Sequence, residues 1–402
     1  MLNMYYERSY SNHIINLSHF YPVITLCGAR QSGKTTLLRN TFPGHGYVSL
    51  DLPSTAEMAE NNPEEFFRAH KPPLIIDEIQ YAPGLFRYLK QLVDRDRHLM
   101  GQVILTGSQK FNLMKEVSDS LAGRAVILDL ENLSWQEIRR NQEFPFSRET
   151  LEKLMVRGQF PELWRMPEMP APSFYHSYLA TYLERDVRQI LNVTSLRDFE
   201  RFIRALAPRS GQILNKSDLA RDVGVSVKAI NDWISVLQAS NQIVLLEPWY
   251  RNITRRLVKS PKVYFCDTGL LCFLLGITLE NLTASPFKGQ VWESLVFAEL
   301  RKLNHVAANP VSFWFYRDQT TREVDFVWER GGGLSLAECK WKEKPGADDI
   351  TTIMALDEEL TRSQGPGWSG RHFLISNSAN SYSMNDKVDA VNLDSLPDLL
   401  EG

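Results

Sequence analysis

The chain has 402 residues, enough for roughly two to four domains, which excludes a protein built on one small core. With 43% hydrophobic and 23% charged residues, the composition excludes a disordered chain, and no apolar stretch is long enough to span a membrane. The 45 basic and 48 acidic residues give a formal net charge of −3, so binding to nucleic acid would require a local basic patch.

The N-terminal sequence and the cysteines favour an intracellular protein. The first residues, MLNMYYERSY, carry charge and lack the apolar region and the cleavage site of a secretion signal. The cysteines form no CxxC pair, which indicates neither a disulfide scaffold nor a zinc site; they are Cys27, Cys266, Cys272 and Cys339. We therefore expect a cytoplasmic protein without a membrane partner.

Short apolar strands alternate with amphipathic segments from Val23 to about Leu130. The strand-like runs are VITLCG, VSLDL, LIIDE, QVILTGS and AVILDL, and the helix-like runs include TTLLRN and LFRYLKQLVD. Continuously apolar strands separated by helices are typical of a parallel sheet covered on both faces. Residues 1–130 are therefore predicted to form an α/β domain.

A phosphate-binding loop follows the first of these strands. Residues 28–35 read GARQSGKT, which matches GxxxxGK[ST] between a strand and a helix, the context that this motif requires. Backbone N–H groups and the helix N-terminus would hold the phosphates of ATP, Lys34 would neutralise them, and the Thr35 hydroxyl would bind Mg²⁺. The expected nucleotide-binding residues of this segment are Gly28, Gly33, Lys34, Thr35 and Thr36.

The ends of two later strands supply the other residues of this predicted site. LIIDE ends in Asp77, expected to hold the magnesium shell, and in Glu78, expected to polarise the attacking water. QVILTGS ends in Thr106 and Ser108, either of which suits a γ-phosphate sensor. Arg124 is a candidate arginine finger toward a neighbouring subunit, or a surface arginine. A site that binds ATP as a slowly hydrolysing switch is the alternative to an efficient ATPase.

The middle of the chain is predicted to contain two further parts. Residues 131–208 follow a helical pattern in WQEIRR, ETLEKLMVRG and YHSYLATYLERDVRQIL, and would form a lid or spacer. Residues 209–270 show the pattern of a winged helix-turn-helix. In it, Ser217 would cap a short helix, Gly224 would turn the chain, and Ser226 would cap a second helix before the strands QIVLLEP and PKVYFCD.

The winged-helix segment is locally basic. From Arg209 to Lys262, nine lysine and arginine residues stand against four acidic residues. A basic loop beside Trp249 and Tyr250 suits phosphate contacts, and the outward residues of a second helix suit the major groove. The candidate DNA contacts are Lys228 and Asn231 on that helix and, with Lys259 and Lys262 nearby, Arg251, Arg255 and Arg256 in the wing. A module that only packs against the first domain or a partner protein is the alternative.

Residues 275–402 contain a candidate metal site. The helix GQVWESLVFAELRKL precedes three strand-like runs, SFWFYR, REVDFVWE and LSLAECKW. Period-two alternation lets Asp325 converge with Glu338 and Lys340 across a hairpin, and Glu293 falls on the apolar stripe of the helix. Two carboxylates suit Mg²⁺ or Mn²⁺, and a lysine can position water for phosphodiester attack. From the spacing alone, exposed strand charges are the alternative.

These motifs together resemble one family. GARQSGKTTLL, LIIDEIQ, LTGSQ, SLAGR, YLERDVR, RLVKSPKVYFCDTGLL, WESLVFAEL, REVDFV and LAECKW resemble bacterial and archaeal AAA-type ATPases, from about Tyr6 to Lys342. Members of that family carry a C-terminal domain of unknown function 4143 with a restriction-endonuclease-like, PD-(D/E)xK fold. The resemblance implies an ATPase site and a nuclease-like site made of Glu293, Asp325, Glu338 and Lys340 in residues 275–402. It also implies possible ring-like homo-oligomers.

Three functional hypotheses follow. In the first, the protein couples ATP binding and hydrolysis to DNA binding or metal-dependent DNA cleavage. In the second, it is a regulatory or signalling ATPase whose winged-helix and nuclease-like domains bind a partner without cleavage. In the third, it binds DNA in a nucleotide-dependent way and does not cleave it.

Overall fold

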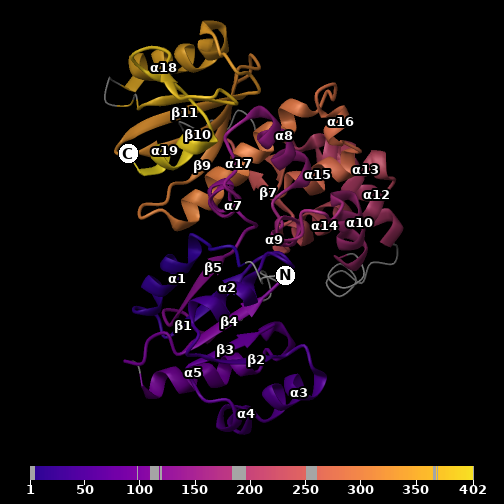
Figure 1. Cartoon of the computed structure of the whole chain (residues 1–402), viewed down its shortest axis with the longest axis vertical. Helices are drawn as coiled ribbons and strands as arrows, with labels where there is room; N and C mark the ends of the chain where they lie inside the picture. The colour runs from indigo at the N-terminus through magenta and orange to yellow at the C-terminus, as the bar shows by residue number, and fades with distance from the viewer. Residues whose placement is uncertain are drawn as a thin grey trace. The chain divides into compact units, whose positions relative to one another are not determined.

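The structure is a computed structural model that places the chain in two compact units. Unit 1 comprises Met1–Leu133, Phe160–Arg165 and Ala239–Asn241, and unit 2 comprises Ser134–Gln159, Met166–Gln238 and Gln242–Gly402. The residues described are 5–96, 98–108, 117, 120–182, 196–249, 260–364, 368 and 370–401. Figure 1 shows the helices and strands of each unit. No helix in these ranges is both long and apolar enough to cross a lipid bilayer.

Unit 1 is built on a five-stranded parallel sheet with the order β2-β3-β4-β1-β5 (Figure 1). Its strands are β1 (Val23–Cys27), β2 (Gly46–Ser49), β3 (Leu74–Asp77), β4 (Val103–Gly107) and β5 (Ala125–Asp129). β1 pairs with β4 and β5, which places Thr25 opposite Leu105 and Ile127. Every residue of β1 and β4 is buried, as expected when both faces of a sheet are covered. The predicted parallel α/β sheet is confirmed.

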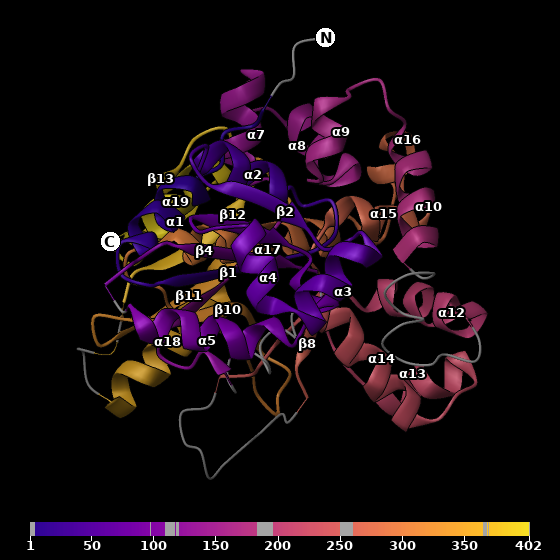
Figure 2. The same ribbon diagram turned by 90° about the horizontal axis from the view of Figure 1, so that it is seen from below.

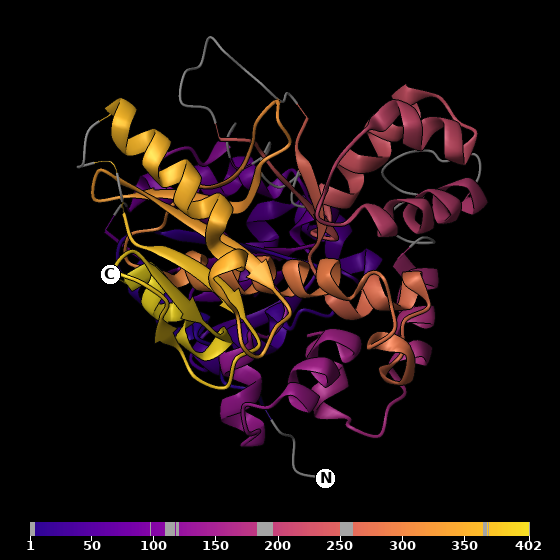
Figure 3. The ribbon, with the colours of Figure 1, turned by 90° about the horizontal axis from the view of Figure 1, so that it is seen from above.

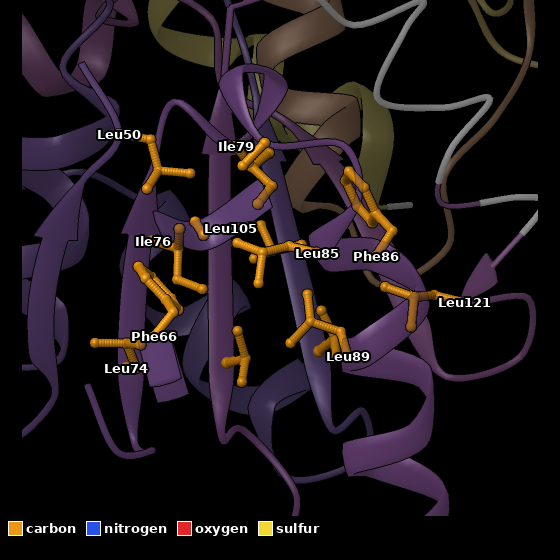
Figure 4. Packing of buried hydrophobic residues seen from close by; sticks show 14 of the residues in the cluster. Leu50, Phe66, Leu74, Ile76, Ile79, Leu85, Phe86, Leu89, Leu105 and Leu121 are labelled. Atoms are coloured by element: carbon orange, nitrogen blue, oxygen red, sulfur yellow. The ribbon is translucent and has the colours of Figure 1, made fainter. Parts of the chain in front are cut away.

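Helices and one apolar cluster cover this sheet. The helices of unit 1 are α1 (Tyr10–Ser18), α2 (Lys34–Thr41), α3 (Pro53–Asn61), α4 (Pro63–Ala69), η1 (Ile79–Tyr81), α5 (Leu85–Arg95) and α9 (Pro161–Arg165). α5 buries Leu85, Phe86 and Leu89 because they share one face of the helix. These side chains pack against Ile76 and Leu105 on one face of the sheet (Figure 4). The cluster fixes the carboxyl ends of β3 and β4, where the polar residues begin.

The first part of unit 2 is helical, as predicted for residues 131–208, of which 183–195 lie outside the described residues. Its helices are α7 (Trp135–Gln142), α8 (Arg148–Arg157), α10 (Ala171–Tyr182), α12 (Leu196–Leu206) and η3 (Ala207–Arg209). α7 begins with a capping box, in which the Ser134 hydroxyl accepts from the Glu137 N–H and the Glu137 carboxylate accepts from the Ser134 N–H. The predicted helix YHSYLATYLERDVRQIL is part of α10 as far as Tyr182, and its remaining residues lie outside the described residues.

A helix-turn-helix follows. α13 (Lys216–Val223) turns at Gly224 into α14 (Val227–Ala239), and both lie beside α12 (Figure 2). The Ser226 hydroxyl caps α14 by accepting from the Ala229 N–H at 3.1 Å, which confirms that prediction. The prediction for Ser217 is wrong: the cap lies two residues earlier, where the Asn215 side chain accepts the N–H groups of the first turn of α13.

The strands after α14 form a small antiparallel sheet. It contains β6 (Gln212–Ile213), β7 (Ile243–Leu246) and β8 (Lys262–Phe265) in the order β6-β8-β7. Beyond β7, the Trp249 N–H donates to the carbonyl of Phe315, and the Phe315 N–H donates to the carbonyl of Glu247. The chain that leaves the helix-turn-helix therefore joins the edge of the next sheet.

A six-stranded mixed sheet completes unit 2, with the order β13-β14-β12-β11-β10-β9. Its strands are β9 (Phe313–Arg317), β10 (Glu323–Arg330), β11 (Gly333–Lys340), β12 (His372–Ser376), β13 (Tyr382–Ser383) and β14 (Val388–Val391). The accompanying helices are α15 (Thr268–Leu275), α16 (Leu279–Leu282), α17 (Lys288–Val306), η4 (Ala347–Ile350), α18 (Thr351–Gln364), η6 (Leu393–Ser395) and α19 (Leu396–Glu401).

Two helices cover opposite faces of the mixed sheet (Figure 3). Phe297 of α17 stacks on Phe326 of β10, whereas Ile353 of α18 packs with Val324 and Val327 in another cluster. The predicted hairpin of β10 and β11 is confirmed by their antiparallel pairing, in which Phe326 lies opposite Ala337. The predicted face-sharing across that hairpin therefore holds.

Candidate functional site

The loop between β1 and α2 has the backbone conformation of a phosphate cradle. Gly28 lies so close to β5 that a Cβ there would stand 2.3 Å from the Leu130 carbonyl oxygen, and Gly33 has φ +92° at the start of α2. The buried Lys34 ammonium donates to the carbonyls of Gly28 and Ala29, at 3.0 Å each. Burial lowers the Lys34 pKa, and the nearby charges of Glu78 and Asp77 oppose that shift.

Asp77 is the last residue of β3, and its carboxylate accepts hydrogen bonds from three hydroxyl groups, one of them on the first turn of α2. Its Oδ2 accepts from Thr35 Oγ1 and from Tyr47 Oη, each at 2.8 Å, and its Oδ1 accepts from Thr106 Oγ1. The structure thus brings together Lys34, Thr35 and Asp77, as predicted. A hydroxyl and a carboxylate in contact beside an ammonium are a donor set that fits Mg²⁺ bound to nucleotide phosphates.

Tyr47 was missed by the sequence reasoning. It lies on β2, the edge strand next to β3, and burial and its hydrogen bond to Asp77 raise its pKa to about 12. Its hydroxyl therefore stays protonated and donates to the Asp77 carboxylate. Nothing in the spacing of β2 marked it, because the strand order that places β2 beside β3 is a tertiary property.

Glu78 occupies a different orientation from Asp77. Its φ of +59° is the left-handed conformation, which costs energy for a non-glycine residue. Its N–H donates to Thr106 Oγ1 at 3.3 Å, and the Gln80 side chain donates to its carboxylate. The carboxylate therefore has a defined direction beside the cradle, as required of a group that orients water.

The other predicted nucleotide-binding residues differ in their surroundings. The Ser108 hydroxyl is buried without a hydrogen-bond partner within the described ranges, whereas Thr106 is used to hold Asp77. Thr36 is exposed on the first turn of α2. Arg124 donates to the Asp94 carboxylate at 2.7 and 3.1 Å, so a role as an arginine finger would require it to leave that pair. Ser108 is thus the better placed of the two candidate sensors.

Arg8 is a second residue that sequence reasoning missed. Its buried guanidinium donates to the carbonyl of Ser32 at 2.9 Å in the cradle and to the carbonyl of Glu131 at 2.6 Å just beyond β5. It ties the phosphate loop to the end of a neighbouring strand. Because Arg8 precedes the first helix and belongs to no motif, the sequence contained no signal for this contact.

The predicted C-terminal carboxylates do converge in unit 2. Asp325 Oδ2 accepts from the Cys339 N–H at 2.9 Å, and Glu338 is paired with Lys340 at 3.2 Å. Glu293 of α17 reaches the same cluster, where its Oε1 accepts from Tyr264 Oη at 2.5 Å. The four residues predicted for the nuclease-like site are therefore neighbours.

Their centre contains an unexpected cation. The Lys262 Nζ lies 3.1 Å from Glu293, 2.6 Å from Glu323 and 3.3 Å from Asp325, and Lys262 is 1% exposed. The prediction that Lys262 contributes to an exposed basic wing is wrong, because the alternation of β8 turns it inward with Tyr264. Trp249 is also buried, and its Nε1 donates to Glu329 rather than standing beside a DNA surface.

The fit of this cluster to a divalent cation is poor. No group of three or more histidine, cysteine, aspartate or glutamate side chains in the described part of the chain is arranged to hold a metal. The ligand roles predicted for Glu293, Asp325 and Glu338 conflict with an ammonium that already contacts two of them.

Glu338 is expected to make the stability of unit 2 depend on pH. Burial and the Asp325 charge raise its pKa to about 9, while burial and Asp325 raise that of Glu293 to about 7. Between an unfolded pKa of about 4.3 and these values the native state binds the extra protons, so stability falls as the pH rises through that window. From pH 7.5 to 9 the loss comes mainly from Glu338, at up to about 1.4 kcal/mol per pH unit.

The variant Glu338→Gln tests this titration, because glutamine keeps a neutral side chain at every pH. The thermal midpoint of the natural protein should fall between pH 7.5 and 9, and that of Glu338→Gln should stay flat. Glu358→Gln, on the exposed side of α18, is the control and should follow the natural protein. Equal pH slopes for Glu338→Gln and the natural protein would contradict the prediction.

The helix-turn-helix candidates are partly described. Lys228 and Asn231 are exposed on α14, while Ile230, Trp233 and the rest of the predicted apolar stripe are buried. Asn231 Oδ1 accepts from Lys216 Nζ at 2.8 Å, so the outward side of α14 is polar. The wing candidates Arg251, Arg255 and Arg256 lie outside the described residues.

Asp267 is a buried carboxylate that links three segments by hydrogen bonds, and the sequence analysis did not single it out. It caps α15 by accepting from the Leu270 N–H at 2.9 Å, and it also accepts from the Gln159 N–H at 2.8 Å and from Tyr175 Oη at 2.7 Å. One carboxylate thus joins α8, α10 and α15. Its place at the end of the run PKVYFCD, before a helix, is the signal that would have indicated a cap.

Replacement of Asp267 by alanine should destabilise unit 2 by about 3 kcal/mol, since three buried donors lose their acceptor. Chemical unfolding followed by tryptophan fluorescence measures the change. Asp267→Asn keeps an acceptor oxygen and should recover part of the loss, and Asp232→Ala on the exposed side of α14 should have little effect. An unchanged unfolding midpoint in Asp267→Ala would show that these hydrogen bonds do not stabilise unit 2.

Three family models match successive parts of the chain. Residues 21–139 match a family model described as an AAA domain, residues 148–281 match a domain of unknown function (DUF8612), and residues 288–396 match a domain of unknown function (DUF4143). An uncharacterized protein of Mycobacterium tuberculosis is 32% identical over 356 residues, covering 86% of this chain and 76% of that protein. An uncharacterized protein of Methanocaldococcus jannaschii is 24% identical, covering 75% and 70%.

A similarity to solved structures is also found. The Walker-type ATPase of Pyrococcus abyssi matches with 15% identity and a TM-score of 0.45, covering 67% of this chain and 96% of that chain. The RuvB Holliday junction branch migration motor of Thermotoga maritima matches with 14% identity and a TM-score of 0.31, covering 60% and 91%.

Proposed function

Because the chain belongs to the family of AAA-type P-loop ATPases with a C-terminal DUF4143 domain, we propose that it hydrolyses ATP at the cradle between β1 and α2. The observation that supports this most directly is the 2.8 Å contact of Thr35 Oγ1 with Asp77 beside the buried Lys34 ammonium. These three groups come from two separate motifs, 42 positions apart, and the fold brings them together.

The residues of the chain divide the work in this proposal. Lys34 and the N–H groups at the start of α2 bind the β and γ phosphates, and Thr35 and Asp77 hold Mg²⁺, which supplies charge neutralisation there. Glu78 orients the attacking water and accepts its proton, and Ser108 contacts the γ-phosphate. Tyr47 and Thr106 keep the Asp77 carboxylate in position by donating to it.

The test is phosphate release by the full chain with saturating ATP. Repeated turnover that stops when Mg²⁺ is chelated is the expected result, and ADP should support no release. A single release per protein molecule would favour the slow switch. No release above the level of buffer would contradict the proposed hydrolysis.

We further propose that ATP state controls binding to DNA through the exposed face of α14. The support is the helix-turn-helix geometry of α13 and α14 and the exposure of Lys228 and Asn231 on the second helix. The regulatory alternative, in which this part only binds a protein partner, predicts no DNA affinity. A homo-oligomer, as in other AAA-type ATPases, is compatible with either and remains part of the proposal.

Lys228→Gln tests the DNA proposal. If Lys228 contacts a phosphate, the variant should bind duplex DNA more weakly regardless of sequence, and the slope of log affinity against log salt should shrink by roughly one. Fluorescence anisotropy at several salt concentrations, with ATP and with ADP, measures both quantities. Lys344→Gln, at an exposed loop position of the C-terminal domain, is the matched control. Unchanged binding in Lys228→Gln would exclude α14 as the contact surface.

Metal-dependent cleavage of DNA is the remaining hypothesis for the C-terminal domain. It requires Asp325 and Glu338 to bind a divalent cation with Lys340 beside them, and the contacts of Lys262 argue against it. Plasmid nicking with Mg²⁺ or Mn²⁺, with and without ATP, is the test. Nicking that disappears in both Asp325→Ala and Lys340→Ala would establish cleavage, whereas its absence favours binding alone.

A further inference from the structure

The carboxylate cluster of unit 2 is organised around one side chain. Carboxylate oxygens of Glu323, Glu293 and Asp325 converge on Lys262 Nζ at 2.6, 3.1 and 3.3 Å. The ring of Phe315 adds a cation–π contact, with its centroid 5.6 Å from the ammonium. Four groups that attract a cation therefore surround a lysine that is 1% exposed.

Such burial of a lysine is energetically costly unless its charge is paired and hydrogen-bonded. Here the pairing is complete, because an ammonium has three donors and three carboxylates receive them. Tyr264, two residues further along β8 and on the same side of the strand, donates to Glu293 Oε1 at 2.5 Å. The strand thus supplies both the cation and a hydroxyl that orients one of its carboxylate partners.

The position of the ammonium is also the position that a divalent cation would need. Mg²⁺ binds carboxylate oxygens at 2.0 to 2.1 Å and keeps near-octahedral geometry, so it requires open space between the carboxylates. In this cluster the space between Glu293 and Asp325 contains Lys262 Nζ. A metal and this ammonium would compete for the same oxygens, and each would repel the other.

We infer that Lys262, which lies in the segment that matches DUF8612, is the resident cation of this carboxylate cluster and takes the place of a divalent metal among Glu293, Glu323 and Asp325. The cluster then serves as a charged anchor, which fastens β8 of the helix-turn-helix region to the mixed sheet. Lys340 lies outside this role, since its contact is with Glu338 and its side chain is 41% exposed.

Binding of Mn²⁺ to the nucleotide-free full chain tests this assignment. Titration followed by the electron paramagnetic resonance of free Mn²⁺ should show no site in the natural protein that depends on Asp325, so the natural protein and Asp325→Asn should give the same curve. Lys262→Met should gain one Mn²⁺ site that the natural protein lacks, and the double variant Lys262→Met with Asp325→Asn should lose it. Lys340→Met, which removes an equal charge nearby, should gain none.

A second measurement keeps the assignment testable if Lys262→Met folds poorly. The double variant Lys262→Met with Glu323→Gln restores the balance of charge, and Mn²⁺ should raise its thermal midpoint but not that of the natural protein. A natural protein that binds Mn²⁺ and loses the site in Asp325→Asn would overturn the inference. Phosphate release measured in the same preparations reports on the phosphate loop separately, so failure here and failure of the proposed ATPase are distinguishable.

Discussion

Replacement of Lys34 by alanine is expected to abolish ATP hydrolysis, with a loss of at least about 10³-fold in turnover. Among the described residues, Lys34 is the lysine whose ammonium donates to the carbonyls of the phosphate loop. With a nucleotide bound, it would neutralise the β and γ phosphates. The affinity for ATP should fall as well, because the same charge acts in the bound ground state. Phosphate release and the fluorescence of a labelled nucleotide measure the two effects.

The matched control is Lys90→Ala, on the exposed side of α5 in the same unit. It removes an equal charge without touching the loop, and it should bind and hydrolyse ATP like the natural protein. Full hydrolysis and full affinity in Lys34→Ala would show that the phosphates bind elsewhere, and the ATPase assignment would then fail.

Replacement of Glu78 by glutamine should separate binding from chemistry. Turnover is expected to fall by about 10² to 10³-fold, since glutamine keeps the shape and the hydrogen bonds of the side chain but cannot accept the proton of the attacking water. ATP affinity should stay within a factor of about two, because the contacts that hold the phosphates and the metal belong to Lys34, Thr35 and Asp77.

The comparison variant is Glu64→Gln, at an exposed position of α4, which should leave both quantities unchanged. If Glu78→Gln turned over ATP at the natural rate, another group would have to orient the water, and Gln80 would be the first to examine because it donates to the Glu78 carboxylate. A loss of ATP binding in Glu78→Gln would instead assign Glu78 to the metal site.

The phosphate loop was predictable from the sequence because its chemistry is local. Eight consecutive residues between an apolar strand and a helix specify the positive φ of Gly33, the direction of Lys34 and the start of α2. The apolar runs likewise predicted the strands of the parallel sheet. The reason is clearest for β1, β3 and β4, since a strand buried throughout must be apolar, whereas Gly46 and Tyr47 of the edge strand β2 are exposed. The partners that complete the site, Tyr47 and Arg8, could not be found in this way.

The C-terminal carboxylate cluster could be predicted from the sequence only in part. Alternation along β10 and β11 correctly placed Asp325, Glu338 and Lys340 together, because the two strands form a hairpin whose register is short-range. The same reasoning put Lys262 on an exposed basic wing, since its neighbours in the sequence are basic. Its partners Glu293 and Asp325 lie 31 and 63 positions later, and only the packing of β8 beside α17 and the mixed sheet brings them to it.

The amino-acid sequence alone therefore determined the strands, the phosphate loop and the identity of the acidic residues, because each depends on a residue pattern only a few positions long. The tertiary structure decided which charges meet. It placed β2 beside β3, so that Tyr47 holds Asp77, and it buried Lys262 among carboxylates that a metal would otherwise need. Charges interact through space over a few ångströms, and the distance between two residues along the chain does not fix that separation.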